Sequence, residues 1–145
     1  MEILIEDRQD RHTIDHEEIR QKARLILEAL GSPEAELSLF IVGDQEMADL
    51  NNRYLGRSGP TNVMAFAMHE GPFGEISPNL LGDVAICVDA ASREARDMAI
   101  TTEVRFDQLL IHGILHLFGF DHEKERDDAE AMTKKEEQLM KLLQQ

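Results

Sequence analysis

Two histidines inside an apolar stretch are the feature that most constrains this chain. His112 and His116 stand four residues apart between Leu109 and Phe118. On a helix, residues four apart lie on the same face, at the spacing that two imidazoles need to bind one metal ion. The residues around the pair are almost all apolar, so we expect a buried helix. A buried imidazole without a partner costs on the order of a few kcal/mol, and a shared metal ion removes most of that cost.

A third histidine follows at a distance that suits the same ion. Gly119 is placed to end the helix in the left-handed conformation that glycine adopts cheaply, and the chain can then fold back to bring His122 to the pair. Three neutral imidazole nitrogens with one open position are typical of catalytic zinc sites, whereas structural sites are usually closed by four ligands. We therefore expect one zinc ion per chain, bound by His112, His116 and His122.

The residue after the first histidine distinguishes this motif from a protease motif. The histidine offsets match the long metzincin signature, but the glutamate that serves as general base there is replaced by Gly113. The usual machinery of peptide hydrolysis is therefore incomplete. Because glycine within a helix costs roughly 0.5–1 kcal/mol relative to alanine, Gly113 indicates a close approach to the backbone. The approaching group is either a ligand beside the metal or a neighbouring element of the fold.

The histidine run resembles a known family signature. His-Gly-x-Leu-His-Leu-x-Gly-x-Asp-His, over residues 112–122, is similar to that of the YbeY-type endoribonucleases, bacterial metal-dependent factors linked to ribosomal RNA maturation. Blocks at residues 50–66 and 80–87 are similar to two further blocks of that family, in the same order. The resemblance implies a single-strand-specific endoribonuclease acting at the 3′ end of small-subunit ribosomal RNA and in ribosome quality control. It also implies ribosomal proteins or a ribosome-associated GTPase as partners.

One departure from the family concerns its arginine. The family usually places an arginine directly after the tyrosine, whereas Leu55 follows Tyr54 here. Arg57 and Arg53 are the nearby substitutes. We expect Arg57 to stabilise negative charge on the phosphate through a bidentate contact, and we take Arg57 and His112 as the catalytic residues; a solvated loop position for Arg57 stays open.

Two other classes of function remain open. A zinc peptidase would need a replacement carboxylate, for which Asp83 or Asp121 are the candidates. A non-catalytic ribosome-associated factor would use zinc only to stabilise its fold. Asp83 could also orient a ligand histidine or water, or merely cap a turn.

Composition sets outer bounds on the function. The 145 residues fit a single metal-dependent hydrolase domain, residues 1–145. The formal net charge of −14 argues against an unselective nucleic-acid binder, since such binding depends on Lys and Arg neutralising phosphates. The chain has no apolar run near 18 residues and no signal-peptide pattern at its start, so we expect no membrane association. Its single cysteine, Cys87, reads as a small buried residue and fits a reducing cytoplasm.

Hydrophobic periodicity predicts an α+β domain in which a sheet of about four strands is covered by helices. The expected strands are residues 2–6, 37–42, 62–68 and 84–88, and the expected helices are 16–30, 45–54, 90–98, a long one from 102, and a charged terminal one within 123–145. Asp15, Asp44 and Asp89 are the expected helix N-caps. Residues 69–82, with His69, Glu70 and Glu75, form a long loop and potential lid. We expect the metal-binding helix to pack on the sheet, and His12 and His16 to be solvated.

Overall fold

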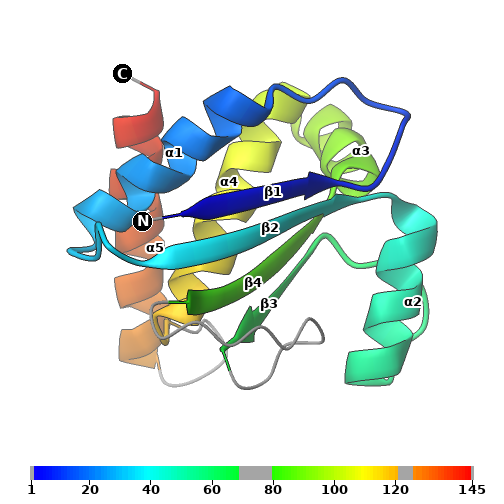
Figure 1. Cartoon of the computed structure of the whole chain (residues 1–145). Coiled ribbons are helices and arrows are strands. Elements are labelled where there is room, and N and C mark those ends of the chain that lie inside the picture. The colour runs from blue at the N-terminus through cyan, green and yellow to red at the C-terminus, as the bar shows by residue number, and fades with distance from the viewer. Residues whose placement is uncertain (1, 69–79, 121–125, 145) are drawn as a thin grey trace.

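The four expected strands form one mixed sheet in the computed structural model, which describes residues 2–68, 80–120 and 126–144 (Figure 1). The strands are β1 (Ile3–Asp7), β2 (Glu36–Val42), β3 (Val63–Ala67) and β4 (Leu80–Cys87), in the spatial order β1-β2-β4-β3. β1, β2 and β4 run parallel, and β3 pairs antiparallel with β4. The inner strands β2 and β4 are buried along most of their length, as parallel strands covered on both faces must be.

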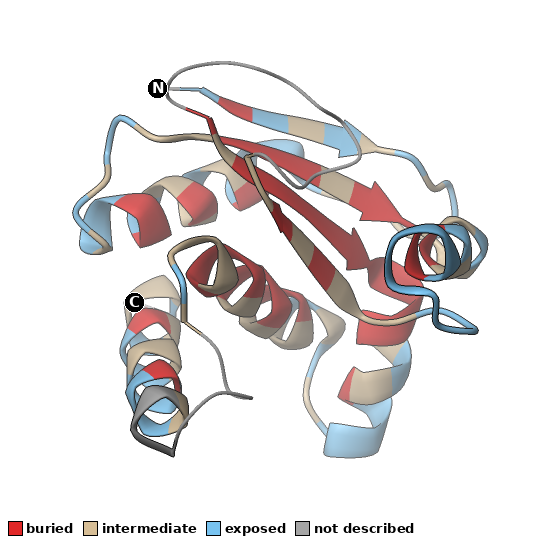
Figure 2. Cartoon of the chain, turned by 90° about the horizontal axis from the view of Figure 1, so that it is seen from below, coloured by how far each residue is buried: buried red, intermediate tan, exposed pale blue. Residues whose placement is uncertain are grey.

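In the described part of the chain five helices cover this sheet, and their order confirms the expected α+β architecture. They are α1 (His16–Ala29), α2 (Asp44–Leu55), α3 (Val88–Met98), α4 (Thr102–Leu117) and α5 (Arg126–Leu143). The apolar sides of α1 and α4 share one core with the sheet, and α5 packs outside them through Met132 and Leu139. α2 covers the opposite face with Met47 and Leu50. Figure 2 shows α4 as the helix with buried residues over most of its length.

The helix starts show which cap predictions were right. Asp15 caps α1, because its Oδ1 accepts a hydrogen bond from the Glu18 amide at 3.1 Å. Asp44 and Asp89 are not caps: α2 and α3 begin one and two residues earlier than expected, with Gly43 and Cys87 at the N-cap positions. Both aspartates lie instead in the first turn, where a carboxylate interacts favourably with the helix dipole.

The fourth strand begins earlier than the sequence indicated. β4 starts at Leu80 rather than Val84, and Gly82 within it has a φ of +157°. A Cβ at Gly82 would collide with the Phe66 carbonyl oxygen and lie 2.7 Å from Leu117 Cδ2. Glycine therefore lets β3, β4 and the end of α4 approach closely. The rest of the potential lid, with His69, Glu70 and Glu75, lies outside the described residues.

A partly buried ionic cluster joins α1 to α4. The Lys22 ammonium lies 3.0 Å from Asp107 and also contacts Glu18 and Glu103 at 3.1 and 3.2 Å. Burial alone would lower the pKa of Lys22, but its hydrogen bonds and attraction to these carboxylates outweigh burial and raise it. Burial also raises the pKa of the Asp107 carboxyl, which Lys22 opposes. Among the described residues, no helix has the length and apolar character needed to cross a membrane.

Candidate active site

α4 brings the two histidines together as their spacing predicted. The Nε2 atoms of His112 and His116 face each other at 3.1 Å, and the ring centroids lie 4.6 Å apart. Two nitrogens that share a tetrahedral zinc ion at bond lengths near 2.05 Å are separated by about 3.3 Å. The pair therefore already has nearly the spacing of two ligands of one ion. His122 lies outside the described residues.

A carboxylate on α5 sets the orientation of the first histidine. His112 donates a hydrogen bond from Nδ1 to Glu136 Oε2 at 3.0 Å. With the proton on Nδ1, the lone pair of the ring is on Nε2, the atom that faces His116. A carboxylate bonded to the outer nitrogen of a histidine is the usual partner of a metal ligand. The donor set of the pair therefore fits a metal ion such as zinc.

Sequence reasoning missed Glu136. It lies 24 residues after His112, within the charged terminal helix that the sequence predicts. Nothing in the local pattern sets Glu136 apart from the other acidic residues of α5. Only the packing of α5 against α4 brings it to the histidine, since this contact is tertiary.

Gly113 serves the packing of α4 on the sheet. A Cβ at this position would lie 2.6 Å from Cγ1 of Val84 and 3.2 Å from Cγ2 of Val63. Valine is stiff about χ1, so these methyl groups cannot easily move aside. Of the two explanations for this glycine, the structure supports the close approach of a neighbouring element. The same packing holds the histidine face of α4 beside β3.

Arg57 shares a cavity with the histidine pair. The cavity measures about 250 Å³, and Arg57, His112, Gly113 and His116 are among the residues that line it. Leu55 also lines it and is half exposed. A single ligand in this cavity could therefore contact both Arg57 and the histidine pair.

The other candidate arginine lies elsewhere. Arg53 lines a separate cavity of about 730 Å³, together with Arg8, Asp44 and Asp89 from the carboxyl ends of the parallel strands. Its guanidinium carbon also lies 5.9 Å from the centroid of the Tyr54 ring. Arg53 and the histidine pair therefore belong to different cavities.

The loop that carries Arg57 is anchored from within α2. Asn51 is buried and donates a side-chain hydrogen bond to the Gly59 carbonyl at 2.9 Å. The Arg57 amide donates to the Asn51 carbonyl at 3.3 Å. Gly56 ends the helix at a φ of +64°, a left-handed conformation that glycine adopts without strain. These contacts fix the path of the loop at both sides of the arginine.

Asp83 lies on the opposite face of the sheet from the histidines. Side chains alternate along a strand, and its neighbour Val84 faces Gly113 of α4. Asp83 is buried within β4 and pairs in register with Phe66, which belongs to the core on the α2 side. Its place inside β4 contradicts the predicted role of turn cap, and the role of orienting a ligand histidine or water stays a prediction. Asp121, the other candidate carboxylate, lies outside the described residues.

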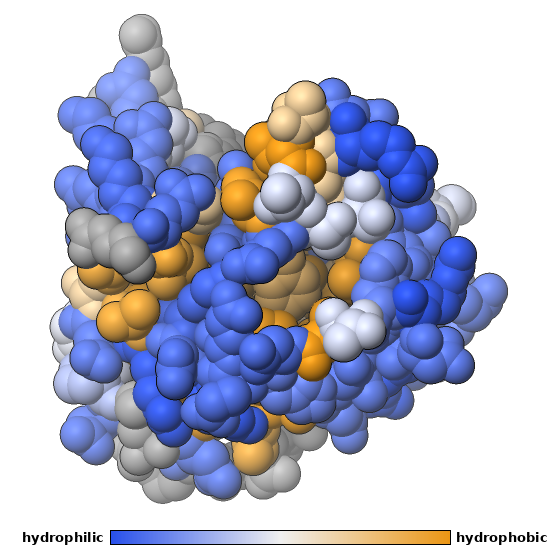
Figure 3. Space-filling model, turned by 90° about the horizontal axis from the view of Figure 1, so that it is seen from above, coloured by the Kyte–Doolittle hydropathy of each residue, from blue (hydrophilic) through white to orange (hydrophobic). Residues whose placement is uncertain are grey.

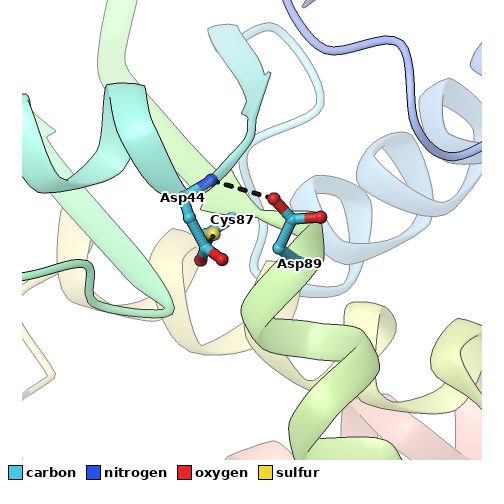
Figure 4. Close-up of side chains that lie close together, drawn as sticks. All are labelled: Asp44, Cys87 and Asp89. Atoms are coloured by element: carbon cyan, nitrogen blue, oxygen red, sulfur yellow. Dashed lines mark hydrogen bonds between the residues drawn. The ribbon is translucent and has the colours of Figure 1, made fainter.

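A second group of potential ligands lies at the carboxyl ends of β2 and β4 (Figure 4). One ligand atom from each of Asp44, Cys87 and Asp89 lies within 4.8 Å of the other two, an arrangement compatible with a metal ion. Hydrogen bonds already engage them: the Asp44 amide donates to Asp89 at 2.9 Å, and Cys87 Sγ donates to Asp44 at 3.3 Å. Burial raises the pKa of the Cys87 thiol to about 11, so the thiolate that metals prefer is disfavoured.

Two further side chains complete this second group. Arg93 donates to both carboxylate oxygens of Asp44, at 2.6 and 3.1 Å, and these hydrogen bonds hold the pKa of Asp44 below its usual value. His12 Nε2 lies 3.0 Å from Asp89 Oδ1. His12 is partly buried rather than fully solvated, with a side chain 28% exposed, because the segment after β1 folds back onto the start of α3. The His16 side chain is 46% exposed, as expected. We interpret the group as a set of hydrogen bonds and ion pairs that holds the β2–α2 turn against the β4–α3 turn.

Comparisons with known proteins agree with the motif. Residues 4–144 match a family model described as "Endoribonuclease YbeY". Curated proteins of that name are similar to this chain: one from Geobacter sulfurreducens is 45% identical over 99% of this chain and 97% of its own length, and one from Syntrophotalea carbinolica is 45% identical over 94% and 92%. The solution structure of a Thermotoga maritima protein has a TM-score of 0.70 at 24% identity, over 97% of this chain and 88% of that one, which shows a shared fold. Since the family model spans nearly all of the sequence and these relatives align along most of their length, the chain belongs to the YbeY family of endoribonucleases.

Proposed function

We propose that this chain is a zinc-dependent endoribonuclease that cleaves single-stranded RNA beside the histidine pair of α4. The observation that carries the proposal is the geometry of that pair. Two Nε2 atoms face each other at 3.1 Å, and Glu136 holds the outer nitrogen of His112. His112, His116 and His122 would hold one zinc ion per chain. When bound, zinc supplies Lewis acidity toward a phosphate oxygen and acidifies a water molecule.

Arg57 is the proposed group for binding the phosphate. Its guanidinium is planar and can donate two parallel hydrogen bonds to phosphate oxygens, which stabilises the charge that develops during cleavage. It lines the same cavity as the two histidines, and Asn51 anchors its loop. These two facts favour Arg57 over Arg53 as the substitute for the arginine that the family places after its tyrosine.

A zinc peptidase function has less support than a ribonuclease function. Gly113 stands where a metalloprotease has its general base, and Asp83 lies on the far face of the sheet. Asp121, the other candidate carboxylate, lies outside the described residues. Arg57 in the cavity of the histidine pair favours a reaction on a phosphate, because a guanidinium binds two phosphate oxygens at once.

The cellular substrate follows from the family. We propose ribosomal RNA, at the 3′ end of the small-subunit RNA and during ribosome quality control, as the target in the cytoplasm. Ribosomal proteins or a ribosome-associated GTPase would be the partners that present it. The net charge of −14 supports a presented substrate, because an acidic protein repels long free RNA.

The deciding experiment compares two substrates on the same preparation. Protein purified without chelator is assayed on a single-stranded RNA and on casein, together with His116→Ala and elemental analysis. We expect close to one equivalent of zinc per chain, RNA cleavage without casein cleavage, and loss of both zinc and cleavage in the variant. Casein cleavage, or equal zinc in wild type and His116→Ala, would refute the proposal.

A further inference from the structure

A second cavity adjoins His112, and Arg57 is not among its lining residues. It lies between α4 and α5 and measures about 610 Å³, within the range of roughly 300–1,000 Å³ typical of ligand sites. His112 and Val63 line both this cavity and the one that contains Arg57. His112 therefore stands where the two cavities meet.

The two cavities together follow α4 along much of its length. Their lining residues on this helix run from Val104 to His116, twelve positions, which at 1.5 Å per residue corresponds to about 18 Å. A strand that crosses the histidine pair from Arg57 would continue toward the α4–α5 cavity. The two cavities together, which we call the trough, are thus longer than one phosphate group needs.

The lining of the α4–α5 cavity suits a single nucleotide. Val104, Leu109 and Met140 provide apolar surface, while Gln108 and Gln144 provide amides. Lys141 is exposed in the last turn of α5 and forms no ion pair with a described residue. A base can rest on apolar side chains while amides meet its polar edge.

Other charges limit what the cavity can bind. Arg105 also lines it, but its guanidinium is held by Glu94 at 2.8 Å and by Gln108 at 2.8 Å. Glu136 and Glu137 add negative charge at the same wall. Lys141 is therefore the cation best placed for a phosphate, and the site favours one phosphate over an extended polyanion.

We propose that the α4–α5 cavity is a nucleotide subsite of the enzyme, which binds the nucleotide next to the cleaved linkage. Its base lies against Val104, Leu109 and Met140, and its outer phosphate contacts Lys141. This inference rests on the proposed ribonuclease function. It assigns a length requirement to the substrate: a dinucleotide fills only the region of the histidine pair, whereas a longer strand also fills the subsite.

The test measures how affinity depends on the length of the RNA. The probes are single-stranded 2′-O-methyl phosphorothioate oligonucleotides of two and five nucleotides, with binding to the zinc-loaded protein followed by fluorescence anisotropy. Wild type should bind the five-nucleotide probe about tenfold more tightly, equal to about 1.4 kcal/mol. Lys141→Glu should lose most of this gain and keep the affinity for the dinucleotide. A five-nucleotide probe with abasic outer positions should lose the gain in wild type.

The matched control is Lys134→Glu, which makes the same charge change at an exposed position elsewhere on α5. It should keep the tenfold gain. A gain that is equal in wild type, Lys141→Glu and the abasic probe would overturn the subsite. If RNA is still cleaved in that case, only the subsite is refuted; if wild type neither binds the probes nor cleaves RNA, the proposed function is refuted with it.

Discussion

Glu136 contacts the candidate site through a hydrogen bond to His112. Its carboxylate accepts the Nδ1 proton of His112, and this contact fixes the ring so that Nε2 faces His116. Removal of a carboxylate that hydrogen-bonds a metal-binding histidine typically lowers metal affinity by about 10–100-fold. We expect Glu136→Ala to weaken zinc binding by about that factor, measured by competition with a chromophoric chelator. Glu130→Ala, the same change elsewhere on α5, is the control, and equal zinc affinities in both variants would contradict the role of Glu136.

The side-chain shape of Arg57 should matter as much as its charge. Arg57→Lys keeps the cation but loses the planar fork that binds two phosphate oxygens. We expect RNA cleavage to fall about 100-fold in Arg57→Ala and substantially in Arg57→Lys, with zinc content unchanged in both. Arg53→Ala should cleave RNA at the wild-type rate, because Arg53 lies in the other cavity. The reverse pattern would transfer the role to Arg53.

At the scale of elements, the local sequence pattern predicted those features that depend only on neighbouring residues. Apolar spacing around His112 predicted the buried helix α4, and Gly119 does adopt a left-handed φ of +94° after it. Strand directions were not predictable, because alternation along a strand is the same in parallel and antiparallel pairs. The Glu136 contact and the far-face position of Asp83 depend on how distant elements pack, which one sequence does not reveal.

The link between α1 and α4 should be sensitive to which partner is removed. Lys22→Ala leaves the Asp107 carboxylate, whose side chain is 7% exposed, without its main partner. Removing one member of a buried ion pair costs about 3–5 kcal/mol. We expect that loss in urea unfolding at pH 7. The double variant Lys22→Met/Asp107→Leu should recover most of it, because an apolar pair leaves no unpaired charge. A loss near zero in Lys22→Ala would show that the cluster does not stabilise the fold.

The same lysine gives a pH dependence with a defined sign. The pKa of Lys22 is raised in the folded protein, so its contribution to stability is complete below the unfolded value of about 10.4 and is lost as the pH rises above that value. We expect the free energy of unfolding of wild type to fall above about pH 10.4 more steeply than that of the double variant. Parallel curves for the two proteins would exclude this linkage.

At the scale of the whole molecule, the surface is acidic and the cationic contacts are few. Hydrophilic side chains dominate the face seen in Figure 3, and the chain carries 29 acidic against 15 basic residues. Along the trough, Arg57 and Lys141 are the cations we assign to phosphates, in addition to the proposed zinc ion. Such a surface favours a short, locally bound strand and leaves longer RNA repelled elsewhere. A partner that presents an RNA end would overcome this repulsion.

The salt dependence of binding tests this arrangement directly. Each phosphate that a protein neutralises on a single strand contributes about −0.7 to the slope of log affinity against log salt. Two or three contacts, from Arg57, Lys141 and the metal, therefore predict a slope between about −1.4 and −2.1. The measurement is a titration of a five-nucleotide single-stranded RNA analogue from low to moderate salt. Lys141→Glu should flatten the slope by at least the one contact it removes, whereas Lys134→Glu should leave it nearly unchanged. A slope near −6 would require an extended basic track, and the acidic enzyme would then have no physical need for a partner to deliver its RNA.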